Sequence, residues 1–408
     1  MSDDKKPAIR FKDYSDDWEQ RKVSGIGNIV TGSTPKTSVS DNYGGEFLFV
    51  SPADIQENRY VDETITTLTK KGFDQGRKIR EKASLFVSIG STIGKVAQIN
   101  QESTTNQQIN AVEPYDNFDD DFIFTSLENI SGSIKAIASN QAVPIVNKTT
   151  FGETEIQVPL ELGEQQKIGQ YFVNLDHLIT LHQRKYDKLQ NLKKAMLEKM
   201  FPKNGSNVPE IRFKGFTDDW EQRKLGELVE IGDIDHRMPE TVADGIPYLM
   251  TGDFIATNEL NFDGVKMISE EDYCQLSQKI KPEKGDILFA RYASVGAARY
   301  VDFTREFLIS YSCAIIKKSR KINSKYLYHF ITSNNAQRQI KLEINTGSQA
   351  NIGIDSMKNN IVVSTPSTEE QTKIADVLSN LDYLITLHQR ELEKLNNIKK
   401  ALLEKMFV

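Results

Sequence analysis

The sequence predicts an α+β protein in which two globular domains are separated by two long helices that form an antiparallel coiled coil. Three observations lead to this prediction. A 38-residue amphipathic segment occurs twice, a shorter arm also occurs twice, and the regions between these repeats differ from one another. A duplication of this kind favours internal pseudo-twofold symmetry, in which each element meets its own copy.

The long segment Glu164–Phe201 returns as Glu370–Phe407, with 25 of 38 positions identical. Its apolar residues recur at alternating steps of four and three, which is the period of a coiled coil, and only Lys193 and Lys399 interrupt them. A polar residue inside such a seam can fix its register; the two seam histidines either do this or are half-exposed helix residues. The predicted seam consists of Ile168, Phe172, Leu175, Ile179, His182, Tyr186 and Leu189, and of Ile374, Leu378, Leu381, Ile385, His388, Leu392 and Leu395.

Chain length predicts the direction of the second helix. A helix of 38 residues is about 57 Å long. If the two helices were parallel, the intervening chain would have to travel back over this distance, whereas an antiparallel helix starts where the first one ends. We therefore expect an antiparallel two-helix spacer with a globular domain at each end.

The arm Ile9–Val23 recurs as Ile211–Leu225 with 11 of 15 positions identical, and the only two tryptophans are equivalent in this alignment. Each half of the chain is thus an arm, a globular region and a long helix. The predicted boundaries are 1–17 for the N-terminal arm, 18–163 for the first globular domain, 164–202 for the first helix, 203–219 for a linker, 220–368 for the second globular domain and 369–408 for the second helix.

Both globular regions contain short β-type runs separated by Gly, Pro, Asn and Asp, such as Phe47–Val50 and Asp286–Ala290. Helical patterns are clearest at Asp121–Ser139 and Ser324–Glu343. Mixed α+β domains are expected from this combination. A capping box at Ser367 and Glu370 predicts the start of the second long helix, and Pro202 is expected to end the first.

Composition limits the class of protein. No apolar run is long enough to span a bilayer and the first residues do not form a signal peptide, so a cytoplasmic protein without a membrane partner is expected. Cys274 and Cys313 have no metal-ligand spacing and are expected to be reduced thiols. The net charge of −6 argues mildly against a nucleic-acid partner.

No catalytic motif is found. Gly90–Lys95 resembles a phosphate-binding loop, but only three residues separate its glycines and Val96 follows the lysine, so a glycine-rich turn is expected instead. The sequence has no Gly-x-Ser-x-Gly elbow, no HExxH and no Cys/His cluster. We therefore expect no catalytic residue, no metal and no cofactor in this chain.

The repeated blocks carry a family resemblance over essentially the whole chain. They include the Glu-Gln-x-Lys-Ile helix openings (164–168 and 370–374), the Asn-Leu-Asp-x-Leu-Ile-Thr-Leu-His-Gln-Arg cores and the two Asp-Asp-Trp-Glu-Gln-Arg-Lys blocks. With the Gly32–Pro35 turn and the Gly285–Leu288 strand entry, they resemble the specificity subunit of type I restriction–modification enzymes.

This resemblance implies a function and a set of partners. Each globular domain would be a target-recognition domain that reads one half of a split, asymmetric sequence in double-stranded DNA. Two methyltransferase (M) subunits with S-adenosylmethionine would methylate adenine, and two restriction (R) subunits with ATP and Mg would complete the restricting complex. The chain itself would be a non-catalytic subunit of an adenine methyltransferase and site-specific DNase.

Local basic stretches partly answer the objection from net charge. Between Arg59 and Lys95, eight basic residues stand against four acidic ones, which is either a phosphate-contacting face or an ordinary solvated surface. Arg and Gln suit bidentate contacts to guanine and adenine, so Arg237 and Gln349 are candidate base readers. The other predicted DNA-binding residues are Lys36, Arg59, Lys70, Lys71, Arg77, Lys78, Arg80 and Lys95 in the first domain, and Lys279, Lys281, Arg291, Tyr292 and Arg299 in the second.

Two other functions stay open. A coiled-coil adaptor that links two protein partners explains the long helices equally well, but it gives no reason for duplicating arm and helix while diversifying the domains. A methyltransferase or nuclease in its own right would need cofactor or metal motifs, and these are missing from the sequence.

Overall fold

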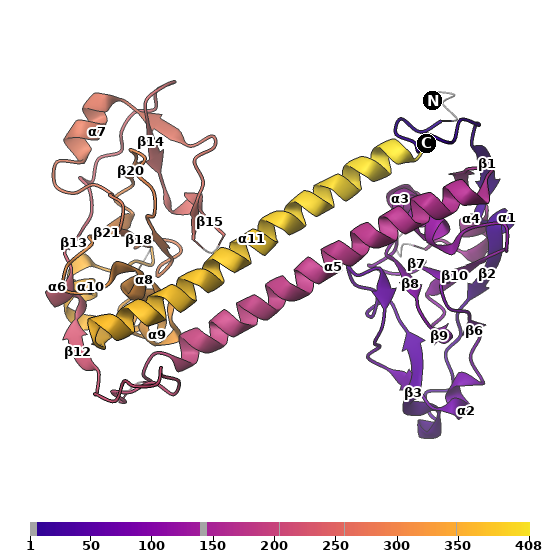
Figure 1. The fold of residues 1–408 in the computed structure, drawn as a ribbon, viewed down its shortest axis with the longest axis horizontal. Coiled ribbons are helices and arrows are strands. Elements are labelled where there is room, and N and C mark those ends of the chain that lie inside the picture. Colours follow the sequence, from indigo (N-terminus) through magenta and orange to yellow (C-terminus); the bar gives the residue numbers. More distant parts are fainter. Residues whose placement is uncertain (1–5, 139–144, 204, 257, 348) are drawn as a thin grey trace. The chain divides into compact units, whose positions relative to one another are not determined.

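The computed structural model of the chain describes residues 6–138, 145–203, 205–256, 258–347 and 349–408. They form two compact units: Met1–Arg184 with Arg390–Val408, and Lys185–Gln389. Each unit contains β-sheets and short helices, and the long helices α5 (Leu162–Lys199) and α11 (Thr368–Met406) each have one end in each unit (Figure 1).

The sheets of the first unit, with the helices beside them, form what we call the first domain. One sheet has the strand order β2-β10-β7-β8-β4 and another has the order β5-β3-β9-β6, while β1 pairs with β11. The elements are β1 (Glu19–Lys22), α1 (Val23–Ile26), β2 (Gly27–Thr31), β3 (Tyr43–Val50), β4 (Tyr60–Val61), β5 (Thr67–Leu68), α2 (Lys70–Phe73), β6 (Lys78–Ile79), β7 (Ser84–Val87), β8 (Val96–Ile99), β9 (Ser103–Thr105), β10 (Ile109–Pro114), α3 (Asp120–Ala138), α4 (Lys148–Gly152) and β11 (Glu155–Val158).

The second domain repeats this plan in the second unit. Its sheets have the orders β13-β21-β18-β19 and β17-β14-β20, with the pairs β12-β22 and β15-β16. The elements are β12 (Glu221–Lys224), α6 (Leu225–Leu228), β13 (Ile231–Gly232), β14 (Ile246–Leu249), β15 (Phe254–Ile255), β16 (Glu259–Leu260), β17 (Lys266–Ile268), α7 (Glu270–Leu276), β18 (Ile287–Ala290), β19 (Ala298–Tyr300), β20 (Leu308–Ile309), β21 (Cys313–Ile316), α8 (Ser324–Thr332), α9 (Asn334–Leu342), α10 (Ile354–Asn360) and β22 (Val362–Thr365).

The duplicated arm adds one strand and one buried tryptophan to each unit. Its Glu-Gln-Arg-Lys block becomes the edge strand β1, which pairs with β11, and in the second unit β12, which pairs with β22. Trp18 is buried against Phe122 and Phe407, and Trp220 is buried against Tyr326. The tryptophans therefore anchor the arm to α3 in the first domain and to α8 in the second.

The repeated arm and helix residues also contact one another. Arg10 donates two hydrogen bonds to Glu164, of 2.7 and 2.8 Å, and the equivalent Arg212 donates two to Glu370, of 2.7 and 2.9 Å. Bidentate pairs of this kind have well-defined geometry. In the second copy they modify the predicted capping box, because the Ser367 hydroxyl accepts from the Glu370 amide while the Glu370 carboxylate binds the arginine instead.

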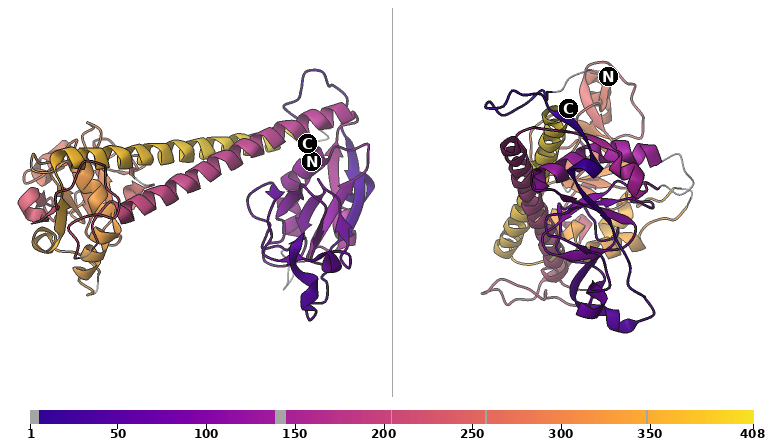
Figure 2. Two further views of the ribbon diagram at one scale, coloured as in Figure 1. Left: turned by 60° about the horizontal axis from the view of Figure 1, so that its bottom comes forward. Right: turned by 90° about the vertical axis from the view of Figure 1, so that its right-hand side faces the viewer.

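The helices run antiparallel in each unit. In the first unit Phe172 of α5 contacts Phe407, which directly follows α11, and four residues further along α5 Asp176 binds Lys399, which lies earlier in α11. The ribbons of the two helices can be followed in Figure 2. In the second unit Lys193 of α5 binds Asp382 of α11. Asp176 and Asp382 occupy the same position of the repeat, as do Lys193 and Lys399. The predicted α+β class, antiparallel helices and pseudo-twofold symmetry are confirmed.

Every predicted seam residue is buried or half-buried. The helical pattern predicted over Ser324–Glu343 is confirmed as two helices, α8 and α9, because Ser333 leaves helical geometry between them and its side chain caps the Ala336 amide. The helix expected at Asp121–Ser139 is α3, and Ser139 itself lies outside the described residues.

We predict that Phe407→Ala destabilises the first unit by about 3–5 kcal/mol, the usual cost of removing a buried aromatic ring. Phe407 contacts Trp18, Phe122 and Phe172 with ring centroids 5.6–6.0 Å apart. Chemical denaturation of the purified chain measures the effect, with Val408→Ala, an exposed neighbour, as the control. Equal stability of the two variants would contradict this packing.

Candidate nucleic-acid interface

Four loops of the first domain emerge at one edge of its sheets. The parallel strands β3 and β9 end there, at Val50 and Thr105, and β2 and β7 end beside the start of β10 at Ile109. Loops on a rigid sheet scaffold are a common location for binding residues. This edge is therefore the candidate interface of the first domain.

The second domain has an equivalent edge. Its parallel strands β14 and β20 end at Leu249 and Ile309. Strand β18 ends opposite Cys313 at the start of β21, and β13 ends opposite Ile315 of the same strand. The loops that follow β13, β14, β18 and β20 thus correspond one by one to those of the first domain. The same framework carries different loop sequences.

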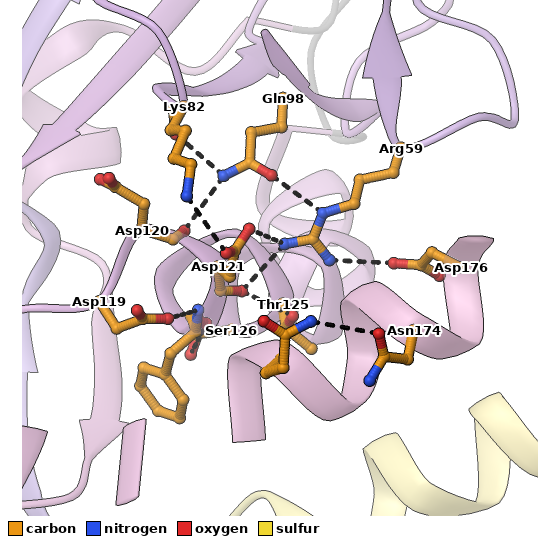
Figure 3. A network of polar contacts seen from close by, with 12 residues as sticks. Arg59, Lys82, Gln98, Asp119, Asp120, Asp121, Thr125, Ser126, Asn174 and Asp176 are labelled. Atoms are coloured by element: carbon orange, nitrogen blue, oxygen red, sulfur yellow. Dashed lines mark hydrogen bonds and ion pairs between the residues drawn. The ribbon is translucent and has the colours of Figure 1, made fainter. Parts of the chain in front are cut away.

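Arg59 does not lie on a free surface. Its side chain is 2% exposed and donates to Gln98 (2.9 Å), Asp121 (2.8 Å) and Asp176 (3.0 Å), as Figure 3 shows. The guanidinium also lies over the ring of Phe124, 4.1 Å from its centroid. Arg59 joins β4 and α3 to α5, so its position corrects the sequence interpretation: it is a structural ion-pair residue.

Arg291 is also internal, with 8% of its side chain exposed. It binds the buried Asp233 and donates to the backbone carbonyl of Ile352 (3.0 Å). Burial alone would raise the pKa of Asp233, but the hydrogen bond from His236 and the charges of Arg291, His236 and Lys279 together lower it. Like Arg59, Arg291 stabilises its own domain rather than offering a charge to a ligand.

Two further arginines organise local structure. Arg299 donates to the backbone carbonyls of Ile255 (3.2 Å) and Ala256 (2.7 Å), and burial lowers its pKa. Arg80 donates two hydrogen bonds to Asp120, of 2.5 and 3.1 Å, and this pairing raises the pKa of Arg80. Both side chains remain partly exposed, so their predicted role in DNA binding stays a prediction.

The predicted cations of the first domain that remain are exposed or half-buried. Lys70 and Lys78 pair with Asp74, and Lys71 pairs with Asp41. Exposed pairs of this kind contribute about 0–1 kcal/mol, so a phosphate can replace them at little cost. Of the other three, Arg77 donates to the carbonyl of Thr31, Lys95 donates to that of Ile55, and Lys36 is exposed in the loop after β2.

Two of the remaining predicted residues of the second domain, Arg237 and Lys279, lie at or beside the loop after β13. Arg237 donates to Asp272 (2.6 Å), and Lys279 lies 3.4 Å from Asp233. Lys281 and Gln349 are exposed and Tyr292 is half-buried. The structure thus brings Arg237 and Lys279 to one edge of the domain, and their contacts with DNA stay predictions.

Sequence reasoning missed the two lysines that interrupt the seam. Lys399 binds Glu128 (2.6 Å) and Asp176 (2.7 Å), and Lys193 binds Asp382. The signal was present in the sequence, because the lysine inside the apolar pattern and an aspartate beside that pattern are retained in both copies.

His329 of α8 lies beside the second of these pairs. Its Nε2 is 3.0 Å from the Ser379 hydroxyl, and its Nδ1 is 3.9 Å from Asp382. Burial, with the positive charges of Lys193 and Lys325, lowers the pKa of His329 to about 3. The imidazole is therefore neutral at physiological pH.

We predict that His329→Gln reduces the acid sensitivity of the second unit. Because the folded-state pKa of about 3 lies below the unfolded value of about 6.5, the unfolded chain binds more protons between these limits. Stability therefore falls as the pH decreases through this window, by about 2 kcal/mol between pH 7 and 5. Denaturation at several pH values should show a smaller fall for the variant, whereas the exposed His177→Gln should match the parent chain. A parallel fall in all three proteins would refute the assignment.

Some kinds of site are absent from the described part of the chain. No group of three or more His, Cys, Asp or Glu side chains is arranged there to hold a metal ion. None of the helices described combines the length and apolar character needed to cross a membrane.

The chain thus has two domains with equivalent sheets but different loops, and each domain is joined to a copy of the same arm and long helix. This arrangement is that of a two-domain specificity protein. The model of the type I restriction modification DNA specificity domain matches the chain twice, at residues 15–191 and 217–397. The chain belongs to this family and is a DNA sequence recognition subunit of the type I restriction–modification class. The resemblance inferred from the sequence is confirmed.

Individual relatives agree with this assignment. The chain is 24% identical over 402 residues to the MjaVIII specificity subunit of a type I restriction enzyme from Methanocaldococcus jannaschii, covering 95% of this chain and 91% of the relative. It is 32% identical over 146 residues to the HindI specificity subunit of Haemophilus influenzae, or 35% and 32% of the two chains. The fold is similar to a crystal structure of the type I S subunit from M. genitalium, with a TM-score of 0.65, 16% identity and 99% of both chains covered.

Proposed function

We propose that this chain reads a bipartite, asymmetric target in double-stranded DNA, with one half-site for each domain. One observation carries the proposal: the two loop edges are built on the same strand framework but present different side chains. Duplicated scaffolds with different reading surfaces would bind two different half-sites, so the complete target would not be a palindrome. The adaptor function gives no reason for this combination.

The long helices would set the distance between the half-sites. Each is a single uninterrupted helix, of 38 residues for α5 and 39 for α11, with one end in each unit. Fixed spacing between recognition elements translates into fixed spacing between half-sites. A separation of about one DNA turn, roughly 10–10.5 base pairs, is the expected value.

Catalysis would come from partner subunits. Two methyltransferase subunits with S-adenosylmethionine would methylate adenines in the target, and two restriction subunits with ATP and Mg would add DNA cleavage. The complex would act in the cytoplasm. This division of labour follows from the family, in which the specificity subunit is the non-catalytic component.

A row of exposed leucines on the helices supports a docking surface for the methyltransferase subunits. In the first unit Leu178 and Leu181 of α5 are 44% and 39% exposed, and in the second unit the equivalent Leu384 and Leu387 of α11 are 38% and 40% exposed. Large apolar side chains that stay exposed at the same positions of both copies indicate a protein-binding surface. Two equivalent surfaces match two methyltransferase subunits.

Methylation mapping tests the proposed function. We expect a host that produces this chain with its methyltransferase subunit to acquire N6-methyladenine in one bipartite, non-palindromic motif. Single-molecule sequencing of the genomic DNA reads the motif, and the methyltransferase subunit produced alone is the control. Methylation of a continuous palindrome, or no methylation by an assembled complex, would refute the proposal.

We predict that the double variant Leu178→Asp, Leu181→Asp removes one of two methyltransferase subunits from the complex. Burying a leucine contributes about 1.5–3 kcal/mol, so placing charges at both positions should weaken docking at this surface by roughly 100-fold or more. Native mass spectrometry measures the stoichiometry. Leu342→Asp, at an 84%-exposed leucine of α9, is the matched control; if it weakens assembly equally, the helix surface is not the docking site.

A further inference from the structure

One short turn is built identically in both domains. In the first domain the Asn106 side chain accepts from the Gln108 amide (3.0 Å), and the Asn106 amide donates to the carbonyl of Val50 (3.0 Å). In the second domain the Ser310 hydroxyl accepts from the Ser312 amide (3.2 Å), and the Ser310 amide donates to Leu249 (2.8 Å). The residue between the bonded residues is Gln107 in the first domain, which is exposed, and Tyr311 in the second, which is half-buried and packs partly against the hydrophobic core.

In each domain the central side chain of this turn contacts a residue of the loop after β2 or, in the second domain, of the equivalent loop after β13. In the first domain the Thr34 hydroxyl donates to the side-chain oxygen Oε1 of Gln107 (2.6 Å). In the second domain the His236 ring stacks on the ring of Tyr311, with centroids 4.9 Å apart and planes inclined by 25°. Strand register shows that these contacts are equivalent. In the first domain Ile29 pairs with Val112; Thr34 lies five residues after Ile29 and Gln107 five residues before Val112. In the second domain Ile231 pairs with Ile316; His236 lies five residues after Ile231 and Tyr311 five residues before Ile316.

The close approach of the two loops in the first domain depends on glycine. A Cβ at Gly32 would lie 2.1 Å from the carbonyl oxygen of Asn106, and the Ser33 amide donates to the carbonyl of Thr105 (2.9 Å). Thr34 is thereby fixed beside the turn by backbone contacts.

We infer that Gln107 and Tyr311 are the base-reading residues of the two domains, and that Thr34 and His236 orient them. The inference rests on the proposed function and names the specificity-determining positions within it. We call Gln107 and Tyr311 the tip residues. The backbone framework around them is shared, while their side-chain chemistry differs, as expected for two domains that read different half-sites. Neither tip residue is charged, and a contact from it to a base edge would carry the sequence information that phosphate contacts lack.

The chemistry of each tip limits what it reads. A glutamine recognises adenine by donating to N7 and accepting from N6. Because Thr34 already fixes the carbonyl oxygen of Gln107, the amide nitrogen is oriented as the donor. Tyr311 presents a ring face supported by His236 and is suited to apolar contact with a thymine methyl group.

Cations flank each tip, as a DNA interface requires. Lys36 is exposed two residues beyond Thr34, and Arg77 is exposed and donates through its backbone amide to the Ser33 hydroxyl (3.0 Å). In the second domain Arg237 follows His236 directly and donates to Asp272 (2.6 Å), a partly exposed pair that a phosphate would have to replace. Phosphate contacts would fix the position of the domain while the uncharged tip reads the sequence.

The test is methylation mapping of complexes assembled with Gln107→Ala or Tyr311→Ala, compared with the parent complex. We expect each variant to lose discrimination at a position in one half-site only, by roughly 5- to 150-fold, the usual value of one specific base contact. The two variants should affect different halves. Thr34→Val should relax the same position as Gln107→Ala, whereas Thr34→Ser, which keeps the hydroxyl, should restore it.

Matched controls separate this effect from general damage. Gln101→Ala removes an exposed glutamine before β9, and Tyr115→Ala removes an exposed tyrosine after β10; both should leave the motif unchanged. Co-purification with the methyltransferase subunit confirms that every variant is folded. An unchanged motif in both tip variants overturns the inference alone, whereas a parent complex without a bipartite motif overturns the proposed function.

Discussion

The structure depends on a lysine of one long helix, buried in one unit and half-buried in the other, that is bound to an aspartate of the other helix. Asp176 binds Lys399 and Asp382 binds Lys193, so each copy of the repeat supplies the carboxylate for one pair and the ammonium for the other. Removing one partner of a buried ion pair costs about 3–5 kcal/mol. An apolar seam tolerates a shift of one heptad, but such a shift would leave both lysines without a carboxylate. The pairs therefore specify the register of the helices.

The long helices and the arms could be predicted from the sequence because they consist of periodic and repeated residues. The two long helices, their direction and the arms follow from apolar spacing and from identity between the copies. What spacing could not show is which side chains meet across the fold. Lys193 and Lys399 were interpreted as interruptions of the seam, because their carboxylate partners lie in the other copy. The break at Ser333 was missed for a similar reason, since a serine that caps a helix also occurs within one.

The predicted interface residues were chosen by charge, and charge alone does not distinguish a ligand contact from an internal ion pair. Arg59 and Arg291 are satisfied by Asp176 and Asp233, which are distant in sequence. The reverse holds for Gln107 and Tyr311, which are uncharged residues in short turns without a sequence motif. Their equivalence becomes visible only when the strand register aligns two domains whose sequences have diverged.

These placements account for a DNA-reading chain with a net charge of −6. Nonspecific affinity for DNA comes from unpaired cations and released counterions. Here several of the cations are bound by carboxylates, including Arg80 by Asp120 and Arg237 by Asp272. Breaking each of these partly exposed pairs costs about 0–1 kcal/mol, which lowers the affinity of the chain for any DNA by a small amount and does not affect a contact from an uncharged tip residue. Nonspecific affinity, which comes from cations, is thus separate from sequence reading, which comes from uncharged side chains. A subunit that recognises one sequence among many benefits, because the ratio of specific to nonspecific binding determines which sites are occupied.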